Sequence, residues 1–258
     1  MYDFIYNGKS LLAYGYTIKS IPEREVAERD ITFTELVGGD GSELTDNGGY
    51  KNIDRKYEIN SFPYWLEGQP NDQIVNKIIN WLFSNYDDYK ILRDSFNPGY
   101  FCYAIPKTPN PFLIKAHRLA DTTIIFERKP FWYSDIGNKE KVKEFDTAVS
   151  SATMKLFNEE SIFSAPLIKV DFDSGSGTVT IANSRSERAP MSVVSDSAFN
   201  SITIDSASER VYSENSFFDD CASGDYFPVF LPGENELTVS AQGFKITKVT
   251  VIPRWRRL

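Results

Sequence analysis

Apolar and polar residues alternate along much of the first half of the chain with the two-residue period of β-strands. This alternation is clearest in Glu28–Val37 and Ile53–Phe62. An Asn7-Gly8 pair between short apolar runs is a strong signal for a hairpin turn. The remaining predicted strands of this half are Phe4–Tyr6, Leu11–Ile18 interrupted by Gly15, Tyr100–Ile105, Phe112–Arg118 and Thr122–Arg128.

One stretch, Asn71–Asn85, has the period of an amphipathic helix instead. Its apolar residues recur at spacings of three and four, and Asn71 or Asp72 can cap its start. A second short helix is predicted over Tyr86–Phe96, ended by Asn97-Pro98-Gly99. The apolar positions of the first helix are Ile74, Ile78, Trp81 and Leu82.

The second half shows short strands at sandwich-like spacing, separated by Gly, Ser, Asn and Asp. Ser134–Lys143 is charged and poor in strand signals, so we place a domain boundary near residue 135, giving domains 1–135 and 136–258. Leu231–Asn235 forms a tight turn. The strands predicted for this half are Val170–Phe172, Val179–Ile181, Met191–Val194, Ile202–Ile204, Tyr226–Phe230, Glu236–Val239 and Lys245–Ile252.

Composition and charge narrow the possible functions. The 258 residues carry a formal charge of −8 and the sequence pI is about 4.9, which disfavours stable binding to nucleic-acid phosphates. No apolar run is long enough to span a membrane. The N-terminus has neither the basic head nor the apolar core of a signal peptide, so we expect synthesis in a cytoplasm without export by the general route.

The residues that most often carry catalysis or bind metals are scarce. His117 is the only histidine, and no nucleophile or orienting carboxylate is singled out beside it, so a structural role is favoured. Cys102 and Cys221 read as two buried thiols rather than a disulfide. A zinc site needs four ligands, and the single histidine and two unpaired cysteines do not supply them. We therefore expect no enzyme activity, cofactor or metal.

The glycine-rich stretch Gly38–Gly49 is predicted to be a long loop at the tip of a hairpin formed by Glu28–Val37 and Ile53–Phe62. Calcium binding is disfavoured because Leu44 stands where the EF-hand pattern needs an oxygen ligand. A loop of this length is functional or disordered, so it either contacts a partner or is a mobile surface loop. The candidate interface residues here are Gly39, Asp40, Glu43 and Asp46.

The chain closes with Pro-Arg-Trp-Arg-Arg-Leu. Trp255 and Arg256 are candidate interface residues, because Trp and Arg are enriched among binding hot spots. The competing interpretation, which is favoured, is a last strand whose tryptophan packs internally.

The order of short phrases in the last segment, IDS…VY…GDYFP…LPGEN…VTVIPRWR, resembles the C-terminal domain of distal tail proteins of siphophages that infect Gram-positive bacteria. Ile78–Leu82, Tyr100–Ala104 and Lys129–Phe131 are similar to the family's N-terminal domain in the same order. The resemblance implies an N-terminal domain of strands and one main helix that forms a hexameric ring. It also implies a C-terminal β-sandwich of galectin-like topology.

The function implied by this resemblance is structural: a hub at the phage tail tip, in the virion, that allows DNA passage without specific binding. The implied partners are further copies of the chain, the tail tube protein, a tail-associated hub protein and peripheral receptor-binding proteins of the baseplate. Two alternatives remain, a carbohydrate-binding module of a phage or bacterial adhesin and an appendage hydrolase. The C-terminal half contains no histidine and only one tryptophan, which leaves fold analogy alone to support sugar binding.

Overall fold

The computed structural model divides the chain into two compact units, Met1–Trp132 together with Leu258, and Tyr133–Arg257. Each unit has its own hydrophobic core. Within the described residues the protein is mainly β with one α-helix, as the sequence pattern predicts. The structure describes residues 1–35, 37, 40–61, 71–84, 88–107, 114–115, 118–119, 122–173, 176–185, 189–195, 200–213, 216–217, 222–223 and 226–258.

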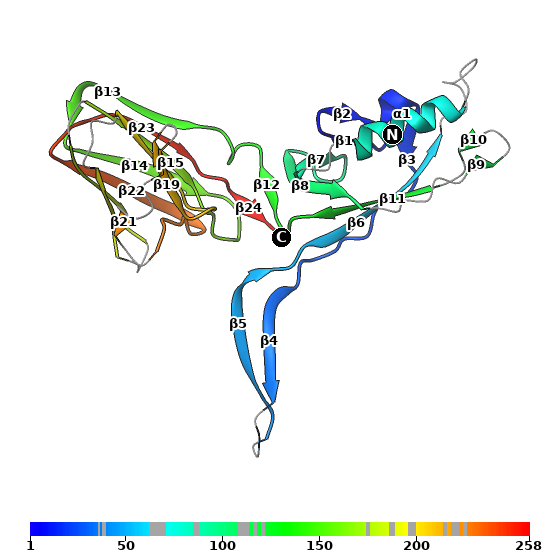
Figure 1. Ribbon diagram of the computed structural model, residues 1–258, viewed down its shortest axis with the longest axis horizontal. Helices are drawn as coiled ribbons and strands as arrows, with labels where there is room; N and C mark the ends of the chain where they lie inside the picture. The colour runs from blue at the N-terminus through cyan, green and yellow to red at the C-terminus, as the bar shows by residue number, and fades with distance from the viewer. Residues whose placement is uncertain are drawn as a thin grey trace. The chain divides into compact units, whose positions relative to one another are not determined.

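Seven strands of the first unit follow one another across an antiparallel sheet in the order β2-β1-β7-β8-β11-β6-β3 (Figure 1). The turn between the first two strands has left-handed backbone at Asn7 and Gly8, as the hairpin signal predicts. A short 3-10 helix covers Leu11–Tyr14. The strands are β1 (Phe4–Tyr6), β2 (Lys9–Ser10), β3 (Tyr16–Ile18), β6 (Ile53–Ser61), β7 (Lys90–Asp94), β8 (Tyr100–Pro106) and β11 (Thr122–Arg128), and two-residue strands β9 (Ile114–Lys115) and β10 (Arg118–Leu119) form a separate pair.

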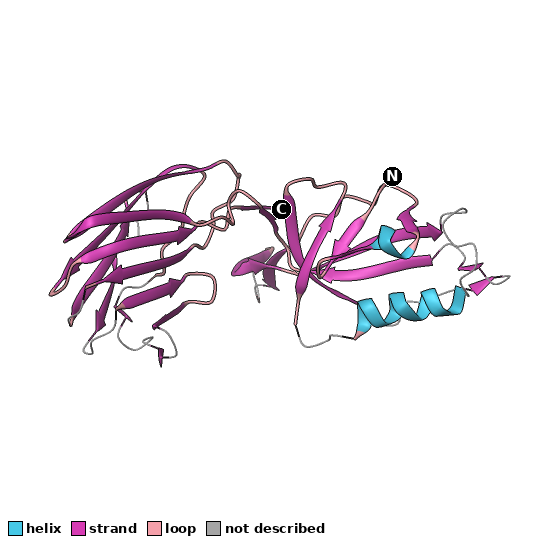
Figure 2. Ribbon diagram, turned by 90° about the horizontal axis from the view of Figure 1, so that it is seen from above, coloured by secondary structure: helices cyan, strands magenta, loops and turns pink. Residues whose placement is uncertain are grey.

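The α-helix α1 (Asn71–Phe83) packs on one face of this sheet (Figure 2). Ile74, Ile78, Trp81 and Leu82, the positions predicted to form its apolar face, are all buried. The Trp81 ring stacks on Phe4, with centroids 5.8 Å apart, and its Nε1 donates a hydrogen bond to the carbonyl of Tyr6. The helix therefore closes the core over the sheet.

A buried ion pair joins two strands of the same sheet. Arg55 on β6 donates to the carboxylate of Asp94 on β7 over 2.8 Å, and the Tyr57 hydroxyl donates to the same oxygen over 2.8 Å. The helix predicted over Tyr86–Phe96 is wrong, because the described residues Lys90–Asp94 are a strand. The alternating burial of that strand places Leu92 and Asp94 in the interior, where their tertiary partners outweigh local preference.

The strand Glu28–Val37 does not pair with Ile53–Phe62 as predicted. Instead β4 (Arg29–Glu35) pairs with β5 (Ser42–Tyr50), which occupies most of the predicted loop, while β6 pairs with β3 and β11. The predicted hairpin is therefore wrong in its second strand. We call the β4–β5 hairpin the arm; in Figure 1 it extends away from the sheet of its own unit.

In the second unit two antiparallel sheets share one core, with orders β13-β23-β15-β18-β19-β20 and β14-β22-β16-β17-β21. The strand predicted at Tyr226–Phe230 is wrong: only Phe230 makes a β-bridge there, with Ser164. The strands of these two sheets are β13 (Lys141–Val149), β14 (Ser151–Asn158), β15 (Leu167–Phe172), β16 (Gly177–Asn183), β17 (Met191–Ser195), β18 (Ser201–Asp205), β19 (Arg210–Ser213), β20 (Ser216–Phe217), β21 (Ala222–Ser223), β22 (Gly233–Gln242) and β23 (Ile246–Ile252). Outside these sheets, β12 (Trp132–Ser134) pairs with β24 (Arg256–Arg257).

Candidate interaction surfaces

The predicted interface residues fall into two sets, one in each unit. Asp40, Glu43 and Asp46 belong to the arm, whereas Trp255 and Arg256 lie at the C-terminal end of the second unit. Gly39 lies outside the described residues. The two sets differ sharply in exposure.

The arm presents a solvent-exposed apolar pair. Phe33 and Leu44 are direct cross-strand partners and are 61% and 55% exposed. Because side chains alternate along a strand, the same face carries Ile31 paired with Asp46 on one side and Glu35 paired with Ser42 on the other. The apolar pair is therefore bracketed by two carboxylates. Because Asp46 is ion-paired with Arg29, this arrangement suits a partner that is apolar in its centre and basic beside Glu35.

The root of the arm is fixed to the body of the unit. The Tyr50 ring, at the end of β5, meets Phe131 edge to face at 5.4 Å between centroids. The Lys51 amide donates to the carbonyl of Glu28 over 2.9 Å, and Arg29 forms an ion pair with Asp46 within the hairpin. Nine residues of β5, at about 3.4 Å each, give the arm a reach of about 30 Å.

The C-terminal residues make contacts inside their own unit. Trp255 is 6% exposed and packs against Gly137, where an added Cβ would lie 2.5 Å from the Cβ of Trp255. The Ser134 amide donates to the carbonyl of Trp255 over 2.9 Å, and the Arg254 amide donates to that of Gly137 over 2.7 Å. Trp255 therefore has a packing role, and a role toward a partner stays a prediction.

The arginines on either side of Trp255 are also held. Arg254 forms an ion pair with Asp205 at 2.5 Å. Burial disfavours the charged form of Asp205, but hydrogen bonding and charge from Arg254 outweigh it, so the pKa of Asp205 lies below its usual value. The Arg256 Nε donates to the carbonyl of Phe163 over 3.0 Å, and its guanidinium lies over the ring of Phe163. Asp205 of IDS and Arg254 of PRWR thus belong to one ion pair.

The Leu231–Asn235 turn owes its shape to buried amide groups. The Asn235 side chain accepts from the Leu231 amide over 2.9 Å and donates to the carbonyls of Leu231 and Gly233. Asn183 donates to the Asn235 side chain over 3.0 Å. Gly233 has a φ of +88°, which only glycine adopts without strain. Gly233 and Asn235 are thus required by the turn itself.

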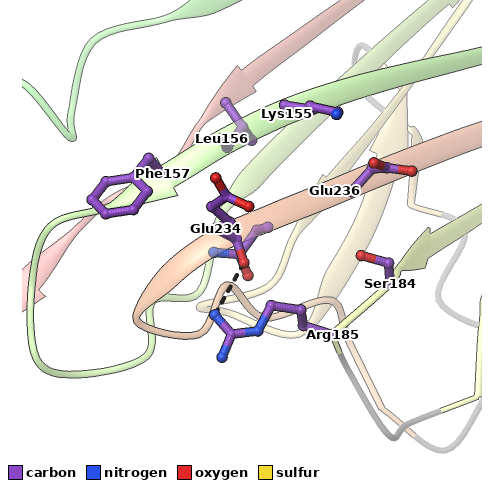
Figure 3. Close-up of a pocket in the computed structure, with 8 residues that line it drawn as sticks. Lys155, Leu156, Phe157, Ser184, Arg185, Glu234 and Glu236 are labelled. Carbon is purple, nitrogen blue, oxygen red and sulfur yellow. Dashed lines mark hydrogen bonds between the residues drawn. The ribbon is translucent and has the colours of Figure 1, made fainter.

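Beside this turn lies a groove of about 290 Å³ across the ends of β14, β22 and β16 (Figure 3). Arg185 is anchored at its base, donating to the carbonyls of Pro232 and Glu234 over 2.7 and 3.1 Å. Phe157, 55% exposed, is the cross-strand partner of Glu234. An exposed ring beside charged groups is a surface on which a polar ligand could stack and form hydrogen bonds.

Other candidate chemistry is limited in the described residues. No group of three or more Asp, Glu, His or Cys in them could hold a metal ion. Burial raises the pKa of the Cys102 thiol to about 12, which leaves it protonated and poorly reactive at neutral pH. His117 and Cys221 lie outside the described residues. None of the described helices has the length and apolar character needed to cross a membrane.

Comparison with solved structures identifies the architecture. The chain matches the crystal structure of the Dit protein of SPP1 over 100% of both chains, with a TM-score of 0.66 and 15% sequence identity. The chain has the Dit fold. A component of the phage P2 baseplate also matches, over 97% of this chain and 98% of that one, with 8% identity and a TM-score of 0.46. No protein-family model and no curated protein matches the sequence.

Sequence reasoning missed the exposed Phe33–Leu44 pair of the arm. The alternation of Ile31, Phe33 and Glu35 was a usable signal, but Leu44 lies in a stretch rich in Gly, Asp and Asn that is typical of loops. The roles of Asn183 and Arg185 were missed as well, because their partners are about fifty residues away in the chain.

Proposed function

We propose that this chain is a structural distal tail protein of a phage. The observation that carries the proposal is the full-length match to the SPP1 Dit protein, which is described as a paradigm of the hub adsorption apparatus in phages that infect Gram-positive bacteria. The C-terminal phrases of the sequence support it, because their residues build the Asp205–Arg254 ion pair and the Leu231–Asn235 turn. The chain then acts through assembly and surfaces, without a reaction or cofactor, at the tip of the virion's tail.

In this proposal the first unit, corresponding to the predicted domain 1–135, forms a hexameric ring. A cyclic ring needs two different surfaces on each copy, because its contacts are heterologous. The arm supplies one of them, since it is fixed at its root and exposes the Phe33–Leu44 pair. The second unit, corresponding to domain 136–258, is a galectin-like sandwich that carries peripheral baseplate and receptor-binding proteins.

The ring joins the tail tube protein to a tail-associated hub protein and lets DNA pass. Six copies at −8 each carry a formal charge of −48. Where part of this charge lines the channel, it repels the DNA backbone instead of retaining it. The synthesis of such a protein takes place in the cytoplasm of the host bacterium.

The test is the size and shape of the purified full-length protein. We expect light scattering at micromolar concentration to give the mass of six copies, or of twelve in two stacked rings, and negative-stain images to show rings. A chain that remains monomeric at every concentration, and also fails to form rings when mixed with purified tail tubes, would contradict the proposal.

The groove in Figure 3 favours a second candidate function, carbohydrate binding by the second unit. In this function a sugar ring stacks on Phe157, and its hydroxyl groups form hydrogen bonds with Arg185 and Glu234. Glycan-array binding by the full-length protein that is lost in Phe157→Ala would support this function. Equal binding by both proteins, or by neither, would exclude the groove as a sugar site.

A further inference from the structure

The chain contains the dipeptide Asn-Gly twice, at Asn7-Gly8 and at Asn47-Gly48. Asparagine is among the chemically labile residues of proteins. A following glycine favours loss of the side-chain amide, because no β-carbon hinders attack by the next backbone nitrogen. The same dipeptide therefore stands in two environments, and the local structure determines which of the two can react.

Asn7-Gly8 is held in the tight turn between β1 and β2. Tyr6 and Lys9, which flank the pair, are cross-strand partners, so the turn consists of Asn7 and Gly8 alone. Both residues have left-handed backbone, with φ of +48° and +75°, and the Asn7 amide donates to the carbonyl of Ile91 over 3.0 Å. A rotation of this backbone would break the pairing of β1 with its neighbours.

Asn47-Gly48 lies in a bulge of the arm. Next to the root of the arm, β5 has three residues where the opposite stretch of β4 has one, and they are Asn47, Gly48 and Gly49. A bulge interrupts the ladder, so its backbone can rotate without breaking a strand pair. Gly48 has a φ of +81°, and a Cβ added at Gly48 or Gly49 would meet no atom of the described residues within 4 Å. The bulge thus has the freedom and the space that closure of a small ring needs.

Two hydrogen bonds restrain Asn47 and Gly48, and both lie at the surface. The Asn47 side chain donates to the Thr32 hydroxyl over 3.2 Å, and the Gly48 amide donates to the Asp46 carboxylate over 3.0 Å. Water replaces exposed hydrogen bonds at little cost. The Asp46 carboxylate also opposes loss of the Gly48 amide proton, because it would stand next to the resulting negative charge. Asp46 therefore slows a reaction that the bulge permits.

We propose that Asn47 is a site of spontaneous deamidation and isomerisation and that Asn7 is protected from both. The Gly48 nitrogen loses its proton and bonds to the side-chain carbonyl carbon of Asn47. The bond from that carbon to the side-chain nitrogen breaks, and the nitrogen takes up a proton and leaves as ammonia. The product is a cyclic succinimide. Water then adds to either carbonyl carbon of the ring and breaks the bond from that carbon to the ring nitrogen, which gives aspartate or isoaspartate. The net reaction consumes water, releases ammonia and is redox-neutral.

The modified arm differs from the original in charge and in backbone length. A carboxylate at position 47 stands close to Asp46 and makes the formal charge of the chain one unit more negative than −8. Isoaspartate also adds a methylene group to the backbone of the bulge. Both changes fall beside the root of the arm, so they alter the way in which the arm joins its unit. This inference does not depend on the proposed ring.

Ageing of the purified full-length protein tests the assignment. The protein is kept at mildly alkaline pH, which favours loss of the amide proton, once in buffer and once unfolded in guanidinium chloride. Peptide mass spectrometry measures the conversion of Asn7 and Asn47, and isoaspartate-specific fragment ions report that the succinimide has formed. In the unfolded chain we expect the two rates to agree within about threefold. In the folded chain we expect Asn47 to react at least about tenfold faster than Asn7, because only the turn must open first.

Two variants separate the contributions of the neighbouring groups. Asp46→Ala removes the opposing carboxylate and is expected to speed the reaction of Asn47 by about two- to fivefold, with Asn7 as the unchanged internal control. Asn47→Gln keeps the amide but lengthens the side chain by a methylene group, so its ring closes more slowly. This variant is expected to remove the isoaspartate signal from the peptide.

The outcomes decide both parts of the assignment. Protection of Asn47 to the level of Asn7 in the wild type and also in Phe33→Thr with Leu44→Thr, which removes the exposed apolar pair of the arm, would overturn the site. Conversion of Asn47 without isoaspartate would overturn the succinimide route. A rate that stays the same or falls in Asp46→Ala would overturn the restraining role of that carboxylate.

Discussion

The arm and the C-terminal segment Pro253–Arg257 both contain candidate interface residues, although the sequence favours packing for the C-terminal segment, and their environments differ. Phe33 and Leu44 of the arm are more than half exposed, whereas Trp255 is 6% exposed. Arg29 and Asp46 of the arm pair in solvent, whereas Arg254 and Asp205 pair where both side chains are largely buried. The arm therefore has apolar surface left for a partner, and the C-terminal segment has used its own in folding.

Trp and Arg residues near the end of a chain can stabilise the chain's own fold or bind a partner, and the degree of burial distinguishes these two roles. Burial of apolar area stabilises a fold by about 25 cal/mol per Å², wherever the residue lies in the sequence. A residue that already contributes this energy to its own unit has little left to give to an interface. Substitutions in the C-terminal segment should thus change stability, and substitutions in the arm should change assembly.

The largest effect is expected from Trp255→Ala. Removing a buried aromatic side chain leaves a cavity and costs about 3–5 kcal/mol. The indole Nε1 has no hydrogen-bond partner among the described residues, so Trp255→Phe loses no such bond and is expected to cost less than about 2 kcal/mol. Urea unfolding of the full chain, with hydrogen exchange to locate the affected amides in 133–257, measures both. A cost below about 1 kcal/mol for Trp255→Ala would show that the indole ring of Trp255 is not part of the hydrophobic core.

A glycine in each region provides the next comparison. A Cβ at Gly137 would lie 2.5 Å from the Cβ of Trp255, so Gly137→Ala must displace the C-terminal segment, at a cost of about 1–3 kcal/mol. Gly49 in the arm has no atom within 4 Å of the same position. Gly49→Ala is expected to leave the free energy of unfolding unchanged within about 0.5 kcal/mol. Equal costs at the two positions would remove the distinction between the regions.

The Asp205–Arg254 ion pair should make the free energy of unfolding depend on pH. The pKa of Asp205 is lowered in the folded state, so its stabilising contribution is present above the usual value of 3.8 and is lost as the pH falls through the lowered value. Asp205→Asn is expected to cost about 1–3 kcal/mol at pH 7 and to flatten the acid limb of the stability curve. Asp46→Asn, which breaks the exposed pair of the arm, is expected to cost about 0–1 kcal/mol. Urea titrations from pH 7 to pH 3 measure both; identical acid limbs for the wild type and Asp205→Asn would contradict the assignment.

The predictable parts of the fold are those in which apolar residues recur with a regular helix or strand spacing along the sequence. The apolar positions of α1 and the alternation of Thr122–Arg128 depend only on near neighbours, and both are confirmed. Lys90–Asp94 was unpredictable because Asp94 is held by Arg55, 39 residues away. Strand β5 was unpredictable because its Asp-Asn-Gly-Gly run is typical of turns, and only pairing with β4 makes it extended.

The candidate surfaces were predictable only in part, for the same reason. Composition indicated Asp40, Glu43 and Asp46, and these do lie in an exposed hairpin. The sequence favoured internal packing of Trp255 but could not identify Gly137 as its neighbour, because Gly137 precedes it by more than a hundred residues.

The smallest effect on stability is expected from replacing the apolar pair of the arm, Phe33→Thr with Leu44→Thr. Both side chains are exposed, and threonine has a high preference for strands, so the hairpin keeps its backbone pairing. We expect the free energy of unfolding to change by no more than about 0.5 kcal/mol, measured by urea unfolding. Val142→Thr, an exposed position on β13, is the matched control for loss of surface apolar area. Light scattering on the same samples should show that the arm variant loses its assembled mass while the control keeps it. A drop in stability of several kcal/mol would mean that the arm packs on its own unit; unchanged stability with unchanged assembly would mean that the pair contacts no other copy.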